Sequence, residues 1–182
     1  MTNKQTILFL SLWCVAAITV QAQNLKSFKG NNGKYGYLNS KGDTIVQPLY
    51  EIAYKFSEGL AAVKLNDQYG YINPTGKLII PHQFRIAGDF TQGLAAVEIN
   101  GKWGFINKMG KEVIAPKYEM AGEFHEGLAA VVLHNKYGFI NKAGKIVIPC
   151  QYDYAYDFVA GKAAVELGKR KFHIDKTGKK VK

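Results

Sequence analysis

Apolar and polar positions form short extended patterns that return at a fixed interval along the chain. In one copy, Trp103 to Asn107 alternates aromatic and other residues with period two, which predicts a β-strand. The preceding apolar run, Leu94 to Ile99, is joined to it through Asn100–Gly101. Asn-Gly between apolar runs predicts a tight hairpin, because both central residues of a type I′ turn need positive φ. After the turn 108–111, a β-branched run from Glu112 to Pro116 predicts a third strand that stops at proline.

The pattern recurs every 34 residues without gaps. One glycine column contains Gly36, Gly70, Gly104 and Gly138. A fixed period of this length predicts stacked supersecondary units, because one small meander is marginal in water and its neighbours must supply the rest of the core. The sequence therefore predicts an all-β fold of tandem 34-residue repeats, each a three-stranded antiparallel meander with a loop or short helical turn as return, stacked as an open solenoid-like array. A closed propeller is the alternative, but its ~4–8 blades are typically four-stranded, which fits four three-stranded repeats poorly.

The glycine column has a structural explanation. Trp103 and Phe105 lie on one face of their strand, and Gly104 leaves the opposite face bare. We therefore expect a neighbouring backbone or ring to approach closely at this glycine.

The N-terminal residues predict export. Lys4 precedes an apolar run from Ile7 to Val20, and a possible cleavage site ends at Ala22, which together are typical of a secretory signal peptide over residues 1–22. The run is too short for the ~20 residues that cross a bilayer, so no transmembrane segment is expected in the mature chain. We expect a periplasmic, cell-surface or extracellular location, with residues 23–182 forming a single domain. Its repeats lie near 34–67, 68–101, 102–135 and 136–169, and 170–182 forms a degenerate cap.

The repeated motif resembles a known family. The motif runs Lys102–Trp103–Gly104–Phe105–Ile106–Asn107, continues with Gly110–Lys111 and ends with Glu126–Gly127–Leu128–Ala129. It resembles the WG-containing (KWG) repeat family over Lys34 to Lys179. The resemblance implies bacterial, often exported β-rich repeat arrays that act as interaction modules and share no catalytic activity. Three copies carry tyrosine where the family has tryptophan, which favours a packing role for this column: Tyr35, Tyr69 and Tyr137.

No catalytic or metal-binding constellation recurs with the repeat. The four histidines occupy four different columns, whereas a metal site built by the repeat needs ligands that recur in one column or form a short cluster. Cys150 is the one cysteine left after signal cleavage, so an internal disulfide is excluded. No Gly-x-Ser-x-Gly elbow and no phosphate-binding loop is present. We therefore expect a non-enzymatic protein without a cofactor or metal.

Charge gives the strongest functional signal. The net charge is +10, and it falls to +9 when the signal and its Lys4 are removed, which favours anionic partners. Lysines gather in the turn between the second and third strands, and acids gather in the return segments, so stacking in register predicts separate basic and acidic ridges. The basic ridge consists of Lys41, Lys77, Lys108, Lys111, Lys142, Lys145, Lys176 and Lys179.

These features favour a protein- or envelope-interaction scaffold that binds a protein or an anionic envelope polymer. No nucleic-acid-binding motif is visible, so we expect no specific nucleic-acid partner. Carbohydrate binding through the repeated aromatic residues is the alternative, and it requires exposed rings. The residues concerned are Tyr35, Tyr69, Trp103 and Tyr137.

Overall fold

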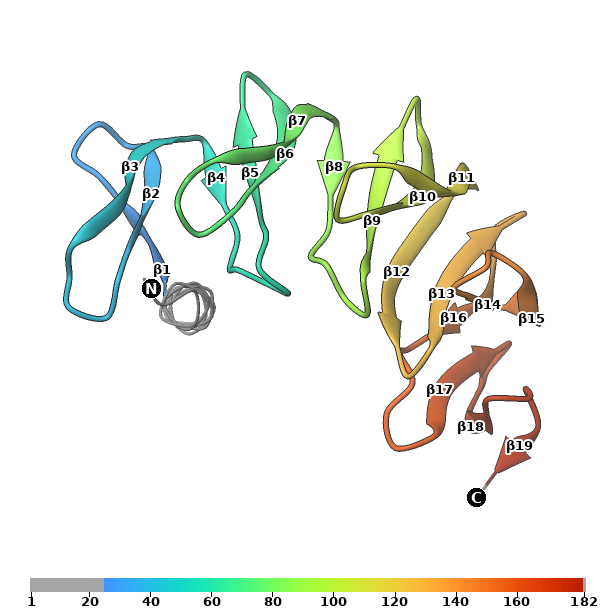
Figure 1. Cartoon of the computed structure of the whole chain (residues 1–182). Helices are drawn as coiled ribbons and strands as arrows, with labels where there is room; N and C mark the ends of the chain where they lie inside the picture. Colours follow the sequence, from blue (N-terminus) through green and yellow to red (C-terminus); the bar gives the residue numbers. More distant parts are fainter. Residues whose placement is uncertain (1–24, 182) are drawn as a thin grey trace, which may run out of the picture. The chain divides into compact units, whose positions relative to one another are not determined.

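The computed structural model describes residues 25–181, which form strands and turns and contain no helix (Figure 1). In this range, accordingly, no helix has the length and apolar character needed to cross a membrane. The predicted signal peptide, residues 1–22, lies outside the described residues. The chain divides into two compact units, Met1–His82 and Gln83–Lys182.

The N-terminal unit contains two antiparallel sheets whose strands pair in chain order. The first sheet contains β1 (Lys26–Lys29), β2 (Tyr35–Leu38) and β3 (Thr44–Tyr50). The second sheet contains β4 (Ile52–Ala53), β5 (Ala61–Leu65), β6 (Gln68–Ile72) and β7 (Leu78–Phe84), which extends past the unit boundary.

The C-terminal unit contains three sheets with the same strand order. The third sheet contains β8 (Ile86–Ala87), β9 (Leu94–Ile99), β10 (Lys102–Asn107) and β11 (Glu112–Tyr118). The fourth contains β12 (Met120–His125), β13 (Leu128–Leu133), β14 (Lys136–Asn141) and β15 (Ile146–Tyr152). The fifth contains β16 (Tyr154–Ala155), β17 (Lys162–Leu167), β18 (Arg170–Asp175) and β19 (Lys180–Val181).

The predicted meander is present, and the return segment adds a fourth strand to it. In the third sheet, the predicted strands are β9, β10 and β11. Ahead of them, Ile86 and Ala87 of β8 pair with Glu98 and Val97 of β9. The next return segment, which the sequence predicts as a loop or short helical turn, contains β12. A neighbouring strand lies close by, so hydrogen bonding to it satisfies the backbone groups of these short segments.

The tight hairpin turns are also as predicted. Asn100 and Gly101 have φ values of 51° and 79°, as a type I′ turn requires. The equivalent turn at His134–Asn135 carries no glycine. There the carboxylate of Glu119 accepts hydrogen bonds from both backbone N–H groups at 3.0 Å. This pair of charge-assisted bonds stabilises a turn that lacks glycine.

The repeated glycine column lies against a β-bulge, whose backbone makes the close approach that the sequence predicts. In the third sheet Trp103 pairs with Tyr118 and Phe105 with Ile114, so Gly104 faces three residues of β11. A Cβ atom on Gly104 would lie 2.5 Å from the carbonyl oxygen of Ile114. The corresponding distances at the other three glycines of the column range from 2.3 to 2.7 Å. The backbone of the bulge therefore occupies the space that any side chain would need.

Within each unit, consecutive sheets pack against each other and share a core. Phe105 of the third sheet packs on Phe124 of the fourth, with ring centroids 4.9 Å apart, and Phe139 packs on Phe158 of the fifth at the same distance. In the N-terminal unit, Tyr37 packs on Phe56 at 4.8 Å.

The inner strand β13 of the fourth sheet shows why the first strand of each sequence repeat is a continuous apolar run. Ala129 and Val131 of β13 belong to the core shared with the third sheet, whereas Leu128 and Ala130 belong to the core shared with the fifth. Both faces of the strand are therefore buried, and the sheets of this unit stack in series. The predicted all-β, open, solenoid-like arrangement of tandem repeats is confirmed.

Candidate functional site

The lysines of the predicted basic ridge lie in the turns between the last two strands of each sheet, and all eight are exposed. The turns share one geometry. In the third sheet, the side-chain Oδ1 of Asn107 accepts hydrogen bonds from the backbone N–H groups of Met109 and Lys111, both at 3.0 Å. Asn39, Asn73, Asn141 and Asp175 make the same pair of bonds in the other sheets. These side-chain bonds fix the backbone from which the lysines project.

The turns of the second, fourth and fifth sheets also contact the sheet that precedes them. A Cβ atom on Gly144 would lie 3.1 Å from Cγ2 of Ile114, and one on Gly178 would lie 3.3 Å from Cγ2 of Ile148. The glycines of the turns thus pack on buried residues of the preceding sheet, while the lysines beside them remain in solvent.

The predicted separation of basic and acidic ridges does not hold at the fifth sheet. Lys176 Nζ lies 2.9 Å from Glu126 Oε2, and this contact is the main cause that lowers the pKa of Glu126. The same carboxylate accepts a hydrogen bond from the backbone N–H of Gly161 at 3.0 Å. The turn of the fifth sheet therefore reaches the return loop of the fourth sheet.

A row of exposed aliphatic side chains, which the sequence reading missed, lies beside the lysine turns. Its members occupy one repeat column on the edge strands β3, β7, β11 and β15 and have similar exposed fractions: Ile45 42%, Ile79 37%, Val113 45% and Val147 38%. We call these four residues the aliphatic row. The sequence does contain a signal for this row, because these apolar residues recur at intervals of 34 residues.

The column Tyr35, Tyr69, Trp103 and Tyr137 serves mainly in packing. Tyr69 is 7% exposed, and the ring of Tyr54 stacks on it at 5.9 Å with an interplanar angle of 12°. Burial raises the pKa of Tyr69. Trp103 and Tyr137 are half-buried against the cores of their sheets, and Tyr35 is half-buried with Lys29 Nζ 5.7 Å from its ring centroid.

The described residues contain no group of three or more His, Cys, Asp or Glu side chains placed to hold a metal ion. Cys150 lies in the bulge opposite Gly138, and burial raises the pKa of its thiol, which disfavours the thiolate that a nucleophile needs. Glu98 is the buried charged side chain among the described residues, and it forms an ion pair with Arg85.

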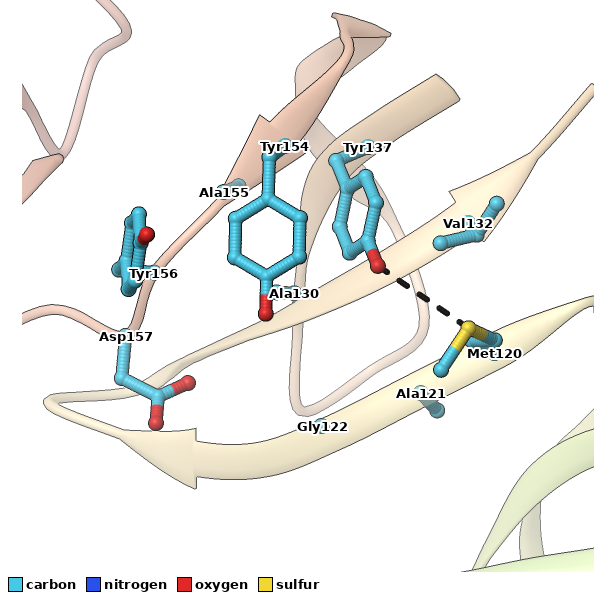
Figure 2. Close-up of a pocket in the computed structure, with 10 residues that line it drawn as sticks. All are labelled: Met120, Ala121, Gly122, Ala130, Val132, Tyr137, Tyr154, Ala155, Tyr156 and Asp157. Carbon is cyan, nitrogen blue, oxygen red and sulfur yellow. Dashed lines mark hydrogen bonds between the residues drawn. The ribbon is translucent and has the colours of Figure 1, made fainter. Parts of the chain in front are cut away.

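A pocket of about 240 Å³ lies between the fourth and fifth sheets (Figure 2). The rings of Tyr137, Tyr154 and Tyr156 line it together with Met120 of β12, and Gly122 lies on the same strand as Met120. The Asp157 carboxylate lies at the end near Tyr156. The Tyr137 hydroxyl contacts Met120 Sδ at 4.0 Å, and burial raises the pKa of Tyr137. Of these residues, Tyr137 is a candidate binding residue predicted from the sequence.

The chain was compared with known proteins. A search among curated proteins finds no match. Among solved structures, a eukaryotic initiation factor matches 86% of this chain at 13% identity with a TM-score of 0.54, and this chain spans half of that protein's length. A plant lectin with two metal-binding sites from Cicer arietinum matches 68% of this chain and 84% of its own, at 13% identity and a TM-score of 0.31. A protein from Bacteroides caccae matches 86% of this chain and 75% of its own, at 14% identity and a TM-score of 0.38.

The likeness to the initiation factor shows a related β-fold and nothing about activity, and the other two are too distant to carry an argument. The model of the WG containing repeat matches four consecutive segments, residues 35–69, 69–103, 103–137 and 137–170. Together these segments span most of the described residues, and their boundaries at Tyr69, Trp103 and Tyr137 coincide with the aromatic column. The chain therefore belongs to the WG-containing repeat family.

Proposed function

We propose that this protein is an exported, non-catalytic scaffold that binds an acidic protein or an anionic envelope polymer through its lysine turns. One observation carries the proposal. The same side-chain-locked turn recurs in all five sheets and presents exposed lysines each time. Repetition of one weak contact raises the overall affinity, because each further contact forms at a high effective concentration.

The aliphatic row favours a protein as the partner. It lies on strands that follow directly after the lysine turns, as in Lys111, Glu112 and Val113. A purely ionic polymer gains nothing from aliphatic side chains, whereas an acidic protein segment with apolar residues would bury them. Burial of apolar area contributes roughly 25 cal/mol per Å² to binding. Burial of several of these side chains would therefore raise the affinity for a protein partner and leave the affinity for an ionic polymer unchanged.

The test compares two variants with the same change in charge. In the first, four turn lysines of the C-terminal unit become glutamine: Lys108, Lys111, Lys142 and Lys145. In the matched control, four exposed lysines outside these turns become glutamine: Lys26, Lys55, Lys117 and Lys169. Binding to polyglutamate and to long-chain polyphosphate is measured by titration calorimetry at several salt concentrations.

We expect the turn variant to lose at least tenfold in affinity and to show a weaker dependence on salt, because fewer ion contacts remain to be screened. The control should lose much less. Equal losses in both variants would mean that net charge alone drives binding, and the turns would have no special role. Substitution of Val113 and Val147 by serine should weaken capture of an acidic partner protein and leave polyphosphate binding unchanged.

Export is tested separately. When the full gene is expressed with its own N-terminus in a bacterial host, we expect the protein outside the cytoplasm with a mass that corresponds to residues 23–182. An uncleaved cytoplasmic product would contradict this part of the proposal.

Carbohydrate binding through the aromatic column has less support. A sugar platform needs an exposed ring face, and the ring of Tyr69 is buried and stacked on Tyr54. A glycan array with the Trp103→Tyr variant as comparison tests this alternative, since a tyrosine already occupies this column in the other three copies.

A further inference from the structure

The pocket between the fourth and fifth sheets has a composition that no other repeat reproduces. Its three tyrosine rings are mutually inclined. Tyr137 and Tyr154 have centroids 4.9 Å apart at an interplanar angle of 44°, and Tyr154 and Tyr156 have centroids 4.9 Å apart at 62°. Tyr154 and Tyr156 are 44% and 43% exposed, so their rings are accessible from solvent. Inclined rings of this kind form a concave surface rather than a flat platform.

Two differences between the copies create this pocket. Tyr154 occupies a column that holds Ile52, Ile86 and Met120 in the other copies, so the fifth sheet contributes a ring where an aliphatic side chain is usual. Gly122 occupies the column of Tyr54, whose ring stacks on Tyr69 within the second sheet. The fourth sheet therefore lacks the ring that would cover Tyr137, and the space beside Tyr137 stays open.

The charges around the pocket are acidic in an otherwise basic protein. Asp157 lines the pocket, and His125 Nε2 lies 3.5 Å from Asp157 and 3.8 Å from Glu123. No lysine or arginine is among the residues that line the pocket. The nearby Lys171 ammonium lies 3.3 Å from Glu166, so its charge is balanced locally.

Within the same cluster, the chain itself places a cation on one of these rings. Lys171 Nζ lies 4.2 Å from the ring centroid of Tyr156. An ammonium group is attracted to an aromatic face by the ring quadrupole, and several rings with a nearby carboxylate are the usual means of recognising quaternary ammonium groups.

We propose that this pocket binds a compact organic cation, a quaternary or methylated ammonium group, with the rings of Tyr137, Tyr154 and Tyr156 around it and Asp157 as the counter-charge. The polarisable sulfur of Met120, beside the Tyr137 hydroxyl, forms a further part of the wall. This inference is independent of the lysine turns, because it concerns a different surface and a ligand of opposite charge.

The test uses the methionine methyl groups of the purified protein. Met120 lines the pocket, whereas Met109 is 80% exposed in the turn between β10 and β11 and serves as an internal control. The protein is labelled with ¹³C at the methionine methyl groups and titrated with tetramethylammonium and with choline. The neutral isostere 3,3-dimethylbutanol is titrated in parallel, as is N-acetylglucosamine.

We expect a saturable shift of the Met120 signal with both cations, little shift of Met109, and binding of the neutral isostere at least tenfold weaker. Tyr154→Ile, which restores the residue type of the other copies, should weaken choline binding about tenfold, since one ring is lost. Asp157→Asn should weaken it severalfold. Val159→Ala changes an exposed residue of the adjacent loop and should leave binding unchanged.

Three results would overturn the proposal: equal shifts with the neutral isostere, a response to the sugar and not to the cations, or unchanged binding in Tyr154→Ile. The source of the cation is resolved in separate arms. Free choline, phosphatidylcholine vesicles and a trimethyl-lysine peptide present the same group, and the arm with the highest affinity identifies its origin. Absence of binding in all three arms would also reject the proposal.

Discussion

Substitution of Gly138 by alanine gives a direct test of how the sheets are built. A Cβ atom at this position would lie 2.6 Å from the carbonyl oxygen of Ile148 and 2.7 Å from the backbone nitrogen of Cys150. Ordinary contacts begin near 3.4 Å. The bulge of β15 would have to move by about 0.8 Å in a close-packed environment, because backbone atoms offer no rotamer that relieves the contact.

The cost can be estimated from the contacts at risk. Overpacking costs typically about 1–3 kcal/mol, and each of the ladder hydrogen bonds beside the bulge contributes about 1 kcal/mol. On either side of the bulge, Tyr137 pairs with Tyr152 and Phe139 with Ile148. We therefore expect Gly138→Ala to lower the free energy of unfolding by about 3 kcal/mol or more, a large share of the ~5–15 kcal/mol of a typical domain.

Gly122→Ala is the matched control in the same sheet. Its Cβ atom would lie 3.7 Å from both the Ala130 carbonyl oxygen and Asp157 Oδ1, which is ordinary contact, and the residue has no positive φ. The exchange should change stability by less than about 1 kcal/mol, and it reduces the entropy of the unfolded chain. Urea denaturation followed by far-ultraviolet circular dichroism measures both variants. A Gly138→Ala protein within 1 kcal/mol of the parent would refute the close-approach explanation of this column.

Substitutions at two further positions test the bulge and the turns. His82 lies in the bulge with its Nε2 buried and without a hydrogen bond, and burial lowers its pKa. The unfolded chain therefore binds more protons below about pH 6.5, so stability should fall as the pH drops below this value. His82→Pro, the residue of the equivalent Pro48 and Pro116, should flatten that dependence in denaturation curves measured from pH 7 to pH 5. Glu119→Ala removes both acceptors of the turn at His134 and should cost about 1–2 kcal/mol. Glu119→Gln keeps one acceptor and should cost less, and equal costs would contradict the two-bond account.

The repeated turns and strands were predictable from the sequence, because residues with specific backbone requirements recur at the same positions in each copy. Asn100–Gly101 specifies its turn through positive φ, and Gly104 specifies a close backbone approach through its missing side chain. Both depend on residues close together in sequence or on a directly paired strand. The two-residue strands such as β8 were not predictable, since Ile86–Ala87 is too short to show a period.

The contacts that form the candidate sites depend on how the fourth and fifth sheets are placed relative to each other. The sequence of a single repeat does not specify this placement. Lys176 meets Glu126, although the column pattern places lysines and acids in separate ridges. The tyrosine pocket combines Gly122, at a position where Tyr54 and Tyr156 carry rings, with Tyr154, which replaces the aliphatic residue of the other copies. Both differences between copies were visible in the sequence, but only the structure shows that the two residues line the same pocket.

The sheets do not coincide with the sequence repeats. The boundary between two matched segments falls at Tyr137, near the start of β14, so the fourth sheet takes its strands from two consecutive copies. A motif excised at its own borders would carry incomplete sheets at both ends. Gain or loss of one whole period by recombination between copies would rejoin equivalent positions and leave every sheet intact. This architecture can therefore change its length between generations without passing through a broken intermediate.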